Sequence, residues 1–283
     1  MAVISVVIPA LNDAVMLARC LEALAAQTRK ADEVVVVDNG STDDTAEVAR
    51  AAGARVILQP QRGIPAATAA GFDAAIGDLV ARLDADSVPS SDWLQRIEDD
   101  FAREPELAAV TGSGQFYGAG KAVRWAGEAL YIGGMFWSMG WLLGHPPLFG
   151  SNFAIRSSTW ARIRDTAHSG IREVHDDLDL SFQFVPGMRV ARDNGLRVGV
   201  SARPFKSLAG LGRRLYWVQT TLAINSKDGS LLRRRSAYRA WAQEQERVAK
   251  SLRRSRPAPT FVGEDGDFGA EFGTDLGTDL SPE

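Results

Sequence analysis

Two carboxylates follow an apolar segment in the first third of the chain. Asp84 and Asp86 come directly after Leu79–Leu83, which is predicted to be a strand. Residues two apart in an extended chain project to the same side, so the two carboxylates share one location. Like charges held together need a cation, and oxygen ligands favour Mg²⁺ or Mn²⁺, which also coordinate substrate phosphates. Asp84 and Asp86 are therefore candidate metal ligands; the alternative is a solvated turn.

Another polar segment follows the apolar run Glu33–Val37. Asp38 stands where this second predicted strand ends, in a position to contact a nucleotide base or ribose. Gly40 permits a tight turn, and the segment from Ser41 to Asp44 resembles a capping box for the next helix. The alternative is a strand–turn–helix connection without a binding role.

An acidic segment lies near residue 177. Asp176, Asp177 and Asp179 begin a predicted helix over Asp176–Phe184. The N-terminal end of a helix favours negative charge, and a general base can be held there. The alternative is an acidic helix start without a catalytic role.

The elements that must position these side chains alternate regularly over the first 85 residues. Short apolar runs predict strands at Val3–Ile8, Glu33–Val37, Arg55–Leu58 and Leu79–Leu83. Three helical patterns lie between them. The first has Leu17, Leu21 and Leu24 at helical spacing after a cap at Asn12 or Asp13. The second ends at Gly53, and the third covers Ala66–Ile76. This order predicts an α/β fold with a parallel sheet, which binds ligands beyond the carboxyl ends of its strands.

The remainder of the chain is less regular. We predict a helix at Trp93–Phe101, strands at Val110–Phe116 and Arg197–Ser201, and basic helices within 207–254. Residues 1–202, 203–256 and 257–283 carry net charges of −7, +11 and −7. We therefore expect a catalytic domain over 1–205, a basic amphipathic helical extension over 206–256 and an acidic disordered tail over 257–283.

Five motifs in this order resemble those of family 2 glycosyltransferases. They are Ser5–Asp13 (SVVIPALND), Val37–Asp43 (VDNGSTD), Leu83–Ser87 (LDADS), Gly150–Arg156 (GSNFAIR) and Asp176–Leu180 (DDLDL). The resemblance covers residues 3–205 and implies the GT-A fold, a mostly parallel Rossmann-like sheet flanked by helices. It also implies an inverting, metal-dependent transfer of a sugar from a nucleoside diphosphate to an acceptor hydroxyl.

The resemblance assigns a role to each matching residue. For the donor it implies contacts from Pro9, Ala10, Asn12, Asp38, Asp84 and Asn152. It makes Asp86 the direct ligand of Mn²⁺ or Mg²⁺, with Asp84 beside it. It also makes Asp177 the general base, with Asp176 as its acidic neighbour.

Two departures from the family pattern concern the substrates. Thr68 stands where many relatives have an arginine that meets the nucleotide, and Arg62 is a nearby substitute. A uridine diphosphate sugar is the default donor, with guanosine and thymidine diphosphate sugars left open. The Gln-x-x-Arg-Trp motif of processive members is missing, which favours addition of one hexose-like sugar.

The acceptor side is predicted from composition. An aromatic stretch between the two acidic motifs suits sugar rings or an apolar lipid, although core packing is the alternative; it contains Trp125, Tyr131, Phe136, Trp137 and Trp141. The arginine-rich helices suit the inner face of a cell membrane, the alternative being a solvated basic face. We therefore expect a cytoplasmic or peripheral membrane enzyme with a lipid-linked or membrane-near acceptor, acting in cell-envelope glycan or glycolipid synthesis.

We find no signal peptide, and Ala129–Leu143 is too short to span a bilayer.

Rival functions are weaker. A nucleotidyltransferase needs a glycine-rich basic loop after the first strand, where this chain has the acidic Pro9–Asp13. A dinucleotide dehydrogenase needs Gly-x-Gly-x-x-Gly there. The acidic core and tail disfavour nucleic-acid binding. A non-catalytic sugar-nucleotide-binding protein remains the alternative.

The sequence has one cysteine, Cys20, which is predicted to be a buried, inert thiol.

Overall fold

The computed structural model describes residues 1–117, 120, 127–201, 208–226 and 231–255. The chain divides into two units, Met1–Glu244 and Gln245–Glu283. In the second unit the described residues are the last part of helix α10, Leu231–Ser255. Every other described element belongs to the first unit, and the predicted acidic tail lies outside the described residues.

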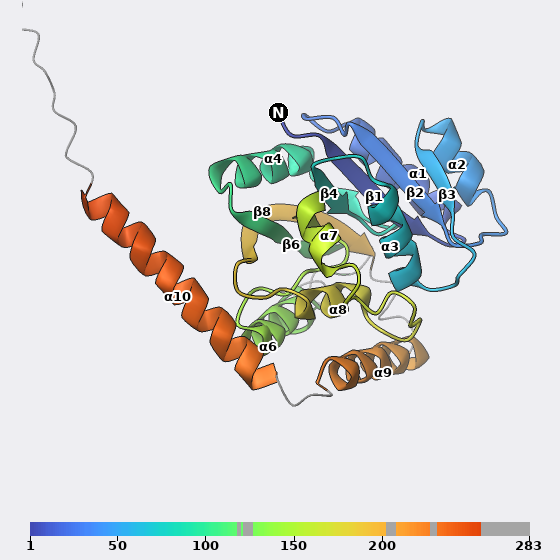
Figure 1. Cartoon of the computed structure of the whole chain (residues 1–283). Helices are drawn as coiled ribbons and strands as arrows, with labels where there is room; N and C mark the ends of the chain where they lie inside the picture. The colour runs from blue at the N-terminus through green and yellow to red at the C-terminus, as the bar shows by residue number, and fades with distance from the viewer. Residues whose placement is uncertain (118–119, 121–126, 202–207, 227–230, 256–283) are drawn as a thin grey trace, which may run out of the picture. The chain divides into compact units, whose positions relative to one another are not determined.

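One mixed sheet forms the centre of the first unit (Figure 1). Among the described residues it has eight strands in the order β3-β2-β1-β4-β7-β6-β8-β5. The strands are β1 Ile4–Ala10, β2 Glu33–Asp38, β3 Arg55–Leu58, β4 Leu79–Arg82, β5 Val88–Pro89, β6 Leu107–Tyr117, β7 Phe153–Arg156 and β8 Arg189–Ser201.

The half of the sheet built from the first 85 residues is parallel, as the sequence predicts. β1 pairs with β2 and β4, and β2 pairs with β3, all in parallel register. β7, which the sequence patterns do not predict, runs antiparallel between β4 and β6. Its start is therefore next to the end of β4, because Phe153 is the register partner of Arg82.

Helices cover both faces of this sheet (Figure 1). They are α1 Ala14–Ala25, α2 Thr45–Ala51, α3 Ile64–Ala74, α4 Trp93–Arg103, the π-helix η1 Gly127–Ile132, α6 Gly133–Leu143, α7 Ser157–Ile163, α8 Asp176–Phe182, α9 Leu208–Asn225 and α10. Helices α1, α2 and α4 pack with Ile4, Val6 and Ile8 on one face. Helices α3, α7 and α8 pack on the other face with Val7 and its neighbours. The alternation along β1 thus separates two apolar layers.

Cys20 belongs to the first of these layers. Its side chain is fully buried, and burial raises the pKa of the thiol well above its usual value. The prediction that Cys20 is buried is therefore confirmed. A thiol held in its neutral form is a poor nucleophile, which agrees with the prediction that Cys20 is inert.

The predicted capping box at the start of α2 is wrong. Helix α2 begins at Thr45, whose N–H donates to Oδ1 of Asp43 at 3.1 Å. The Ser41 hydroxyl instead accepts the N–H of Asn12 at 3.0 Å. Asp43 also accepts the N–H of Ala14 at 3.2 Å, so one carboxylate holds the first turns of α1 and α2.

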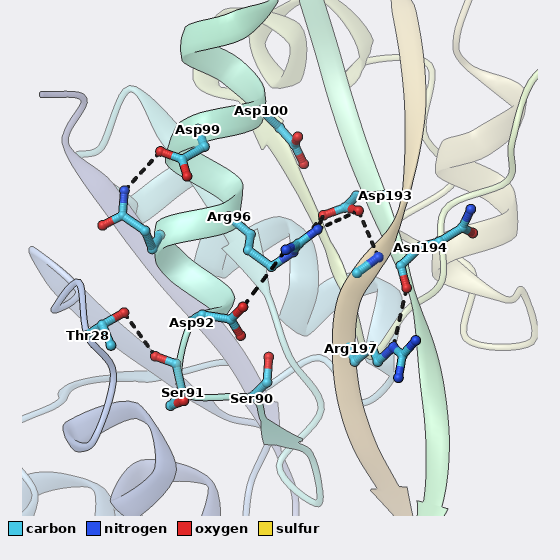
Figure 2. A network of polar contacts seen from close by, with 12 residues as sticks. Thr28, Ser90, Ser91, Asp92, Arg96, Asp99, Asp100, Asp193, Asn194 and Arg197 are labelled. Atoms are coloured by element: carbon cyan, nitrogen blue, oxygen red, sulfur yellow. Dashed lines mark hydrogen bonds and ion pairs between the residues drawn. The ribbon is translucent and has the colours of Figure 1, made fainter. Parts of the chain in front are cut away.

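A polar network joins α4 to an irregularity in β8 (Figure 2). The β6–β8 register shifts between Thr111 and Ser113, where residues 193–196 of β8 stand against Gly112 alone. Arg96 binds Asp193 through two hydrogen bonds of 2.8 and 2.9 Å, and the Gly195 N–H donates to the same carboxylate at 2.8 Å. This bidentate contact fixes the loop that returns β8 to the sheet.

Beyond the sheet, α6, α8 and α9 lie together (Figure 1). Leu143 of α6, Leu178 and Phe182 of α8, and Val218 and Leu222 of α9 share one apolar cluster. The predicted helices within 207–254 are present as α9 and α10. In the described part of the chain, no helix has the length and apolar character to cross a membrane.

Candidate active site

Two adjoining cavities open beyond the carboxyl ends of β1 and β4. The first, of about 560 Å³, is lined by residues from β1, the loop before α3 and the loop before α8. The second, of about 370 Å³, is walled by α6, α8 and α9. They share five lining residues, Ile64, Asp84, Asp86, Arg214 and Trp217. The predicted metal ligands therefore stand at the junction of the two cavities.

A buried arginine connects the acidic motifs at this junction. Arg82, at the end of β4, is 1% exposed. One of its guanidinium nitrogens lies 3.0 Å from Oδ1 of Asp84 and 3.1 Å from Oδ2 of Asp176. Burial lowers the pKa of Arg82, but the charges of Asp176, Asp84 and Asp177 outweigh it and raise the pKa overall. Arg82 thus stays cationic and compensates carboxylates that would otherwise repel one another.

Asp177 is held as an anion at the first turn of α8. Its Oδ2 accepts the Gly150 N–H at 2.8 Å, and its Oδ1 accepts the Leu178 N–H at 2.7 Å. Burial opposes ionisation, but the hydrogen bond and charge of His175, with Arg82 and Gly150, hold the pKa well below its usual value. Asp177 therefore presents a charged carboxylate to the second cavity.

Asp176 differs from its neighbour. It is buried, its Oδ2 accepts the Thr68 hydroxyl at 2.9 Å, and burial, together with the nearby Asp177, raises its pKa despite the opposing charge of Arg82. The Thr68 departure from the family pattern thus has a structural partner here, because its hydroxyl binds the acidic motif.

His175 precedes α8 and stands beside Asp177. Its Nδ1 lies 3.6 Å from Asp177 Oδ1, and its ring contacts Trp217 edge-on with centroids 6.0 Å apart. Burial lowers the pKa of His175, but Asp177 and Asp176 outweigh it, so the pKa is raised. This imidazole is therefore a partner of Asp177 at the second cavity.

The donor set at the junction suits a hard divalent ion. Asp84 is engaged by Arg82 and by the Ser151 hydroxyl, while Asp86 lines both cavities. Among the described residues, no group of three or more His, Cys, Asp or Glu side chains is arranged to hold a metal. One or two carboxylates with substrate phosphates are the usual protein arrangement for Mg²⁺, so the residues fit such an ion.

The predicted donor residues are in part at the first cavity. Pro9, Ala10 and Arg62 line it. Asp38 is buried and accepts the Ser41 N–H at 2.8 Å. Asn12 has a left-handed backbone, with φ 51°, and its side chain accepts the Thr42 N–H at 2.7 Å. Asp38 and Asn12 therefore shape the turn beside the cavity.

Asn152 has a different environment from the one implied by the resemblance. It is 0% exposed. Its Oδ1 accepts the Trp93 indole N–H at 2.8 Å, and its Nδ2 donates to the carbonyls of Ser113 and Leu196 at 3.0 and 2.8 Å. These three hydrogen bonds lie within the core and join α4, β6 and β8. The expectation that Asn152 contacts the donor is therefore corrected, because the Asn152 amide has a structural role.

The lining also includes four large side chains, three of them cationic, that the sequence motifs do not indicate. Arg172 reaches the first cavity from the loop before α8, and α9 contributes Arg213, Arg214 and Trp217. The Gly170 carbonyl accepts the Gln61 amide at 3.2 Å, so the loops before α3 and α8 meet at this cavity. The sequence signal for the three α9 residues is the basic character of their segment, which suits a membrane surface or a solvated face equally well.

The aromatic stretch divides between core and surface. Phe136 is buried, whereas Trp137 and Trp141 are 76% and 55% exposed. Trp125 lies outside the described residues, as does the side chain of Tyr131.

The chain is similar in sequence to known proteins. Residues 5–171 match the model of glycosyl transferase family 2. The glycosyltransferase AglE of Haloferax volcanii is 39% identical over 101 residues, which is 33% of each chain. The undecaprenyl-phosphate 4-deoxy-4-formamido-L-arabinose transferase of Pseudomonas aeruginosa is 40% identical over 116 residues, 38% of this chain and 32% of the relative. The chain thus matches about a third of each of these two relatives.

A solved structure has the same fold. Glucosyl-3-phosphoglycerate synthase from Mycobacterium tuberculosis, in complex with Mn²⁺, UDP and phosphoglyceric acid, superposes with a TM-score of 0.56. The two chains are 23% identical, and the superposition covers 79% of this chain and 78% of the other. The motifs, the sheet and a family match over more than half of the chain agree: the chain belongs to glycosyl transferase family 2 and has the GT-A fold.

Proposed function

We propose that the protein is an inverting glycosyltransferase that moves one sugar from a nucleoside diphosphate, UDP being favoured, to an acceptor hydroxyl. The observation that supports this most is the junction of the cavities. There Asp84 and Asp86 face the first cavity, and Asp176 and Asp177 line the second. A donor diphosphate beside Asp86 would place its sugar toward Asp177.

The chemistry of this arrangement follows from the charges. A divalent ion held by Asp86 and Asp84 would neutralise the charge that develops on the leaving diphosphate. Asp177 accepts the proton of the attacking hydroxyl as the new bond to the anomeric carbon forms and the bond to the nucleotide breaks. A single displacement inverts the anomeric centre. Arg82, which pairs with both Asp84 and Asp176, positions these two carboxylates beside this step.

Relatives support the substrate classes. The solved neighbour was crystallised with UDP and Mn²⁺, and another of its structures holds Mg²⁺ and UDP. The name of the Pseudomonas relative includes undecaprenyl phosphate. On this basis UDP, a divalent metal and a lipid-linked acceptor are the substrates and cofactor that we propose.

The proposal includes peripheral attachment to an anionic membrane. Trp137 and Trp141 are exposed on α6, and the Arg235 guanidinium lies over the Trp141 ring at 4.5 Å. Residues 208–226 and 231–243 contain six arginines and no acidic residue. Exposed indole rings beside guanidinium groups suit the interfacial region of a bilayer with anionic lipids.

A thermal-shift experiment with a panel of nucleoside diphosphates, with and without Mn²⁺, tests the donor proposal. A ligand that binds only the native state stabilises it by roughly 2.7 kcal/mol at a hundred times its dissociation constant. We expect a Mn²⁺-dependent shift with UDP that Asp86→Ala abolishes. A shift with no nucleotide in any condition would contradict the proposal, and nucleotide binding without sugar transfer would favour a non-catalytic binding protein.

A further inference from the structure

Arg214 stands at the point where the two substrates must meet. Of the arginines that the structure describes around the cavities, Arg214 alone lines both. Arg62, Arg172 and Arg213 line only the first cavity, on the donor side. Arg214 is half-buried and close enough to His175 for its charge to act on that ring. A cation at this junction is placed for the reactive end of the acceptor.

The charges around Arg214 leave it available for a ligand. Within the described part of the chain, Arg214 has no carboxylate partner at ion-pair distance, whereas Asp84 and Asp176 are both compensated by Arg82. A guanidinium group binds phosphate through two parallel hydrogen bonds, which a neutral hydroxyl cannot offer. An anionic group on the acceptor therefore fits this position better than an uncharged sugar.

The wall of the second cavity is apolar away from the junction. Met135 and Met139 of α6, Leu148 and Phe149 of the following segment, Leu178 of α8 and Val218 of α9 contribute to it. A sugar acceptor requires hydrogen-bonding partners around its hydroxyls, whereas this wall offers mainly hydrocarbon. The methionines give it the adaptability that suits a flexible chain.

We propose that the acceptor is an amphiphile whose hydrocarbon chain occupies the second cavity and whose phosphate binds Arg214. This inference rests on the proposed function and names the acceptor class for the same site. Cavities that bind small molecules have volumes of about 300–1,000 Å³. At about 370 Å³ the second cavity holds the phosphate-proximal part of a prenyl or fatty chain. The exposed Leu130, also in its lining, marks where a longer chain leaves.

Two sources present this chemistry. In a prenyl monophosphate the attacking oxygen belongs to the phosphate itself, and in a prenyl diphosphate-linked sugar it belongs to a sugar hydroxyl. In both, a bond forms between the acceptor oxygen and the anomeric carbon, the bond to the nucleotide breaks, and the nucleoside diphosphate leaves with the bonding electrons. Any proton on the attacking oxygen passes to Asp177 and then to water.

Calorimetric titration of the full chain with farnesyl phosphate, farnesol and glycerol 3-phosphate tests the inference. We expect farnesyl phosphate to bind at least about tenfold more tightly than either fragment, because only it combines chain and phosphate. Arg214→Ala should remove most of this advantage and leave the affinity for farnesol unchanged. Arg214→Lys, which keeps the charge without the bidentate fork, should retain an intermediate affinity.

The control is Arg162→Ala, which removes an equal charge from an exposed position on α7, outside both linings. It should leave the affinity for farnesyl phosphate within about twofold. Equal losses in Arg214→Ala and Arg162→Ala would show general electrostatic attraction and overturn the inference. Farnesol or glycerol 3-phosphate binding as tightly as farnesyl phosphate would also overturn it.

Two further measurements separate the possibilities. Mn²⁺-dependent UDP binding without farnesyl phosphate binding would overturn the acceptor inference and leave the proposed function in place. Farnesyl phosphate binding without UDP binding would remove the donor proposal alone. Mass spectrometry of products formed with UDP-sugars then distinguishes the sources. A glycosylated farnesyl phosphate identifies the monophosphate, and a product from the farnesyl diphosphate-linked sugar alone identifies the linked sugar.

Discussion

At the scale of single residues, the surroundings of Asp177 keep its carboxylate in the charged form. It accepts two backbone N–H groups and faces His175. Asp177→Asn keeps an oxygen for Gly150 and removes the charge. We expect a rate lower by about 10²–10⁴-fold with UDP affinity within about twofold, measured by steady-state turnover and titration. A near-normal rate would remove Asp177 from the proposed role.

We expect His145 to make the stability of the fold depend on pH. It is 5% exposed, lies between Phe184 and Tyr238, and burial lowers its pKa from 6.5 to about 4. Between these values the unfolded chain binds a proton that the native state does not. The free energy of unfolding should therefore fall as the pH drops through this window, by roughly 1–3 kcal/mol.

Urea titrations at a series of pH values measure this effect. His145→Gln cannot take up the proton, so its stability should fall less steeply than that of the parent between pH 6.5 and about 4. The comparison is between the slopes of the free energy of unfolding against pH, because the substitution also changes packing and therefore the absolute stability. Parallel slopes in the two proteins would show that His145 is not responsible.

At the scale of elements, Asp179 joins three segments beside the active site. Its carboxylate accepts the His168 N–H at 2.7 Å and the Asn225 amide at 2.8 Å, and it is 2% exposed. These bonds connect α8 to the loop that carries Arg172 and to the end of α9. The cavities therefore depend on a residue that lines neither of them.

Asp179→Ala should loosen both attachments. Buried donors left without a partner cost about 1–3 kcal/mol, and we expect that loss in chemical denaturation. Hydrogen exchange should accelerate in residues 164–175 and 221–226. Asp165→Ala is the control, since Asp165 lies on the same loop with a side chain that is 93% exposed. Equal exchange in the two variants would contradict an anchoring role for Asp179.

The parallel half of the sheet was predictable because its signals are local. Each of the strands β1 to β4 is an apolar run bounded by a polar turn or a helix start. β7 has only four residues, and its direction depends on where the chain returns after α6. No pattern within those four residues distinguishes an antiparallel neighbour from a parallel one.

The candidate site was predictable to a similar extent. Asp84, Asp86, Asp176 and Asp177 follow strand ends or begin a helix, and the structure brings them together. Arg82 stands beside Asp84 in the sequence, but its shared contact with Asp176 exists only after folding. The Asn152 amide matched a motif, yet its three bonds arise from segments far away in the chain.

At the scale of the whole molecule, we expect the exposed tryptophans of α6 and the neighbouring arginines to act together. Co-sedimentation with vesicles containing anionic lipid should show binding at low salt that weakens as salt increases, because surface charges are screened. Trp137→Ser combined with Trp141→Ser should weaken binding at every salt concentration.

Val15→Ser provides the comparison for this experiment. Val15 is 70% exposed on α1, a helix that packs on the sheet and contributes to neither cavity. Vesicle binding by this variant should equal that of the parent. If the tryptophan variant and the Val15 variant bind equally well, α6 is not the attachment surface.

The antiparallel course of β7 has a consequence for how such proteins diversify. Between β6 and its antiparallel neighbour β7 the chain makes an excursion from the sheet that includes η1 and α6. This excursion supplies much of the wall of the second cavity, and the first cavity is lined by other segments. An exchange among its cavity-lining side chains, such as Met135, Ser138 and Met139, changes the second cavity without changing a lining residue of the first. The fold thus holds one part constant while another part is free to acquire new acceptors during evolution.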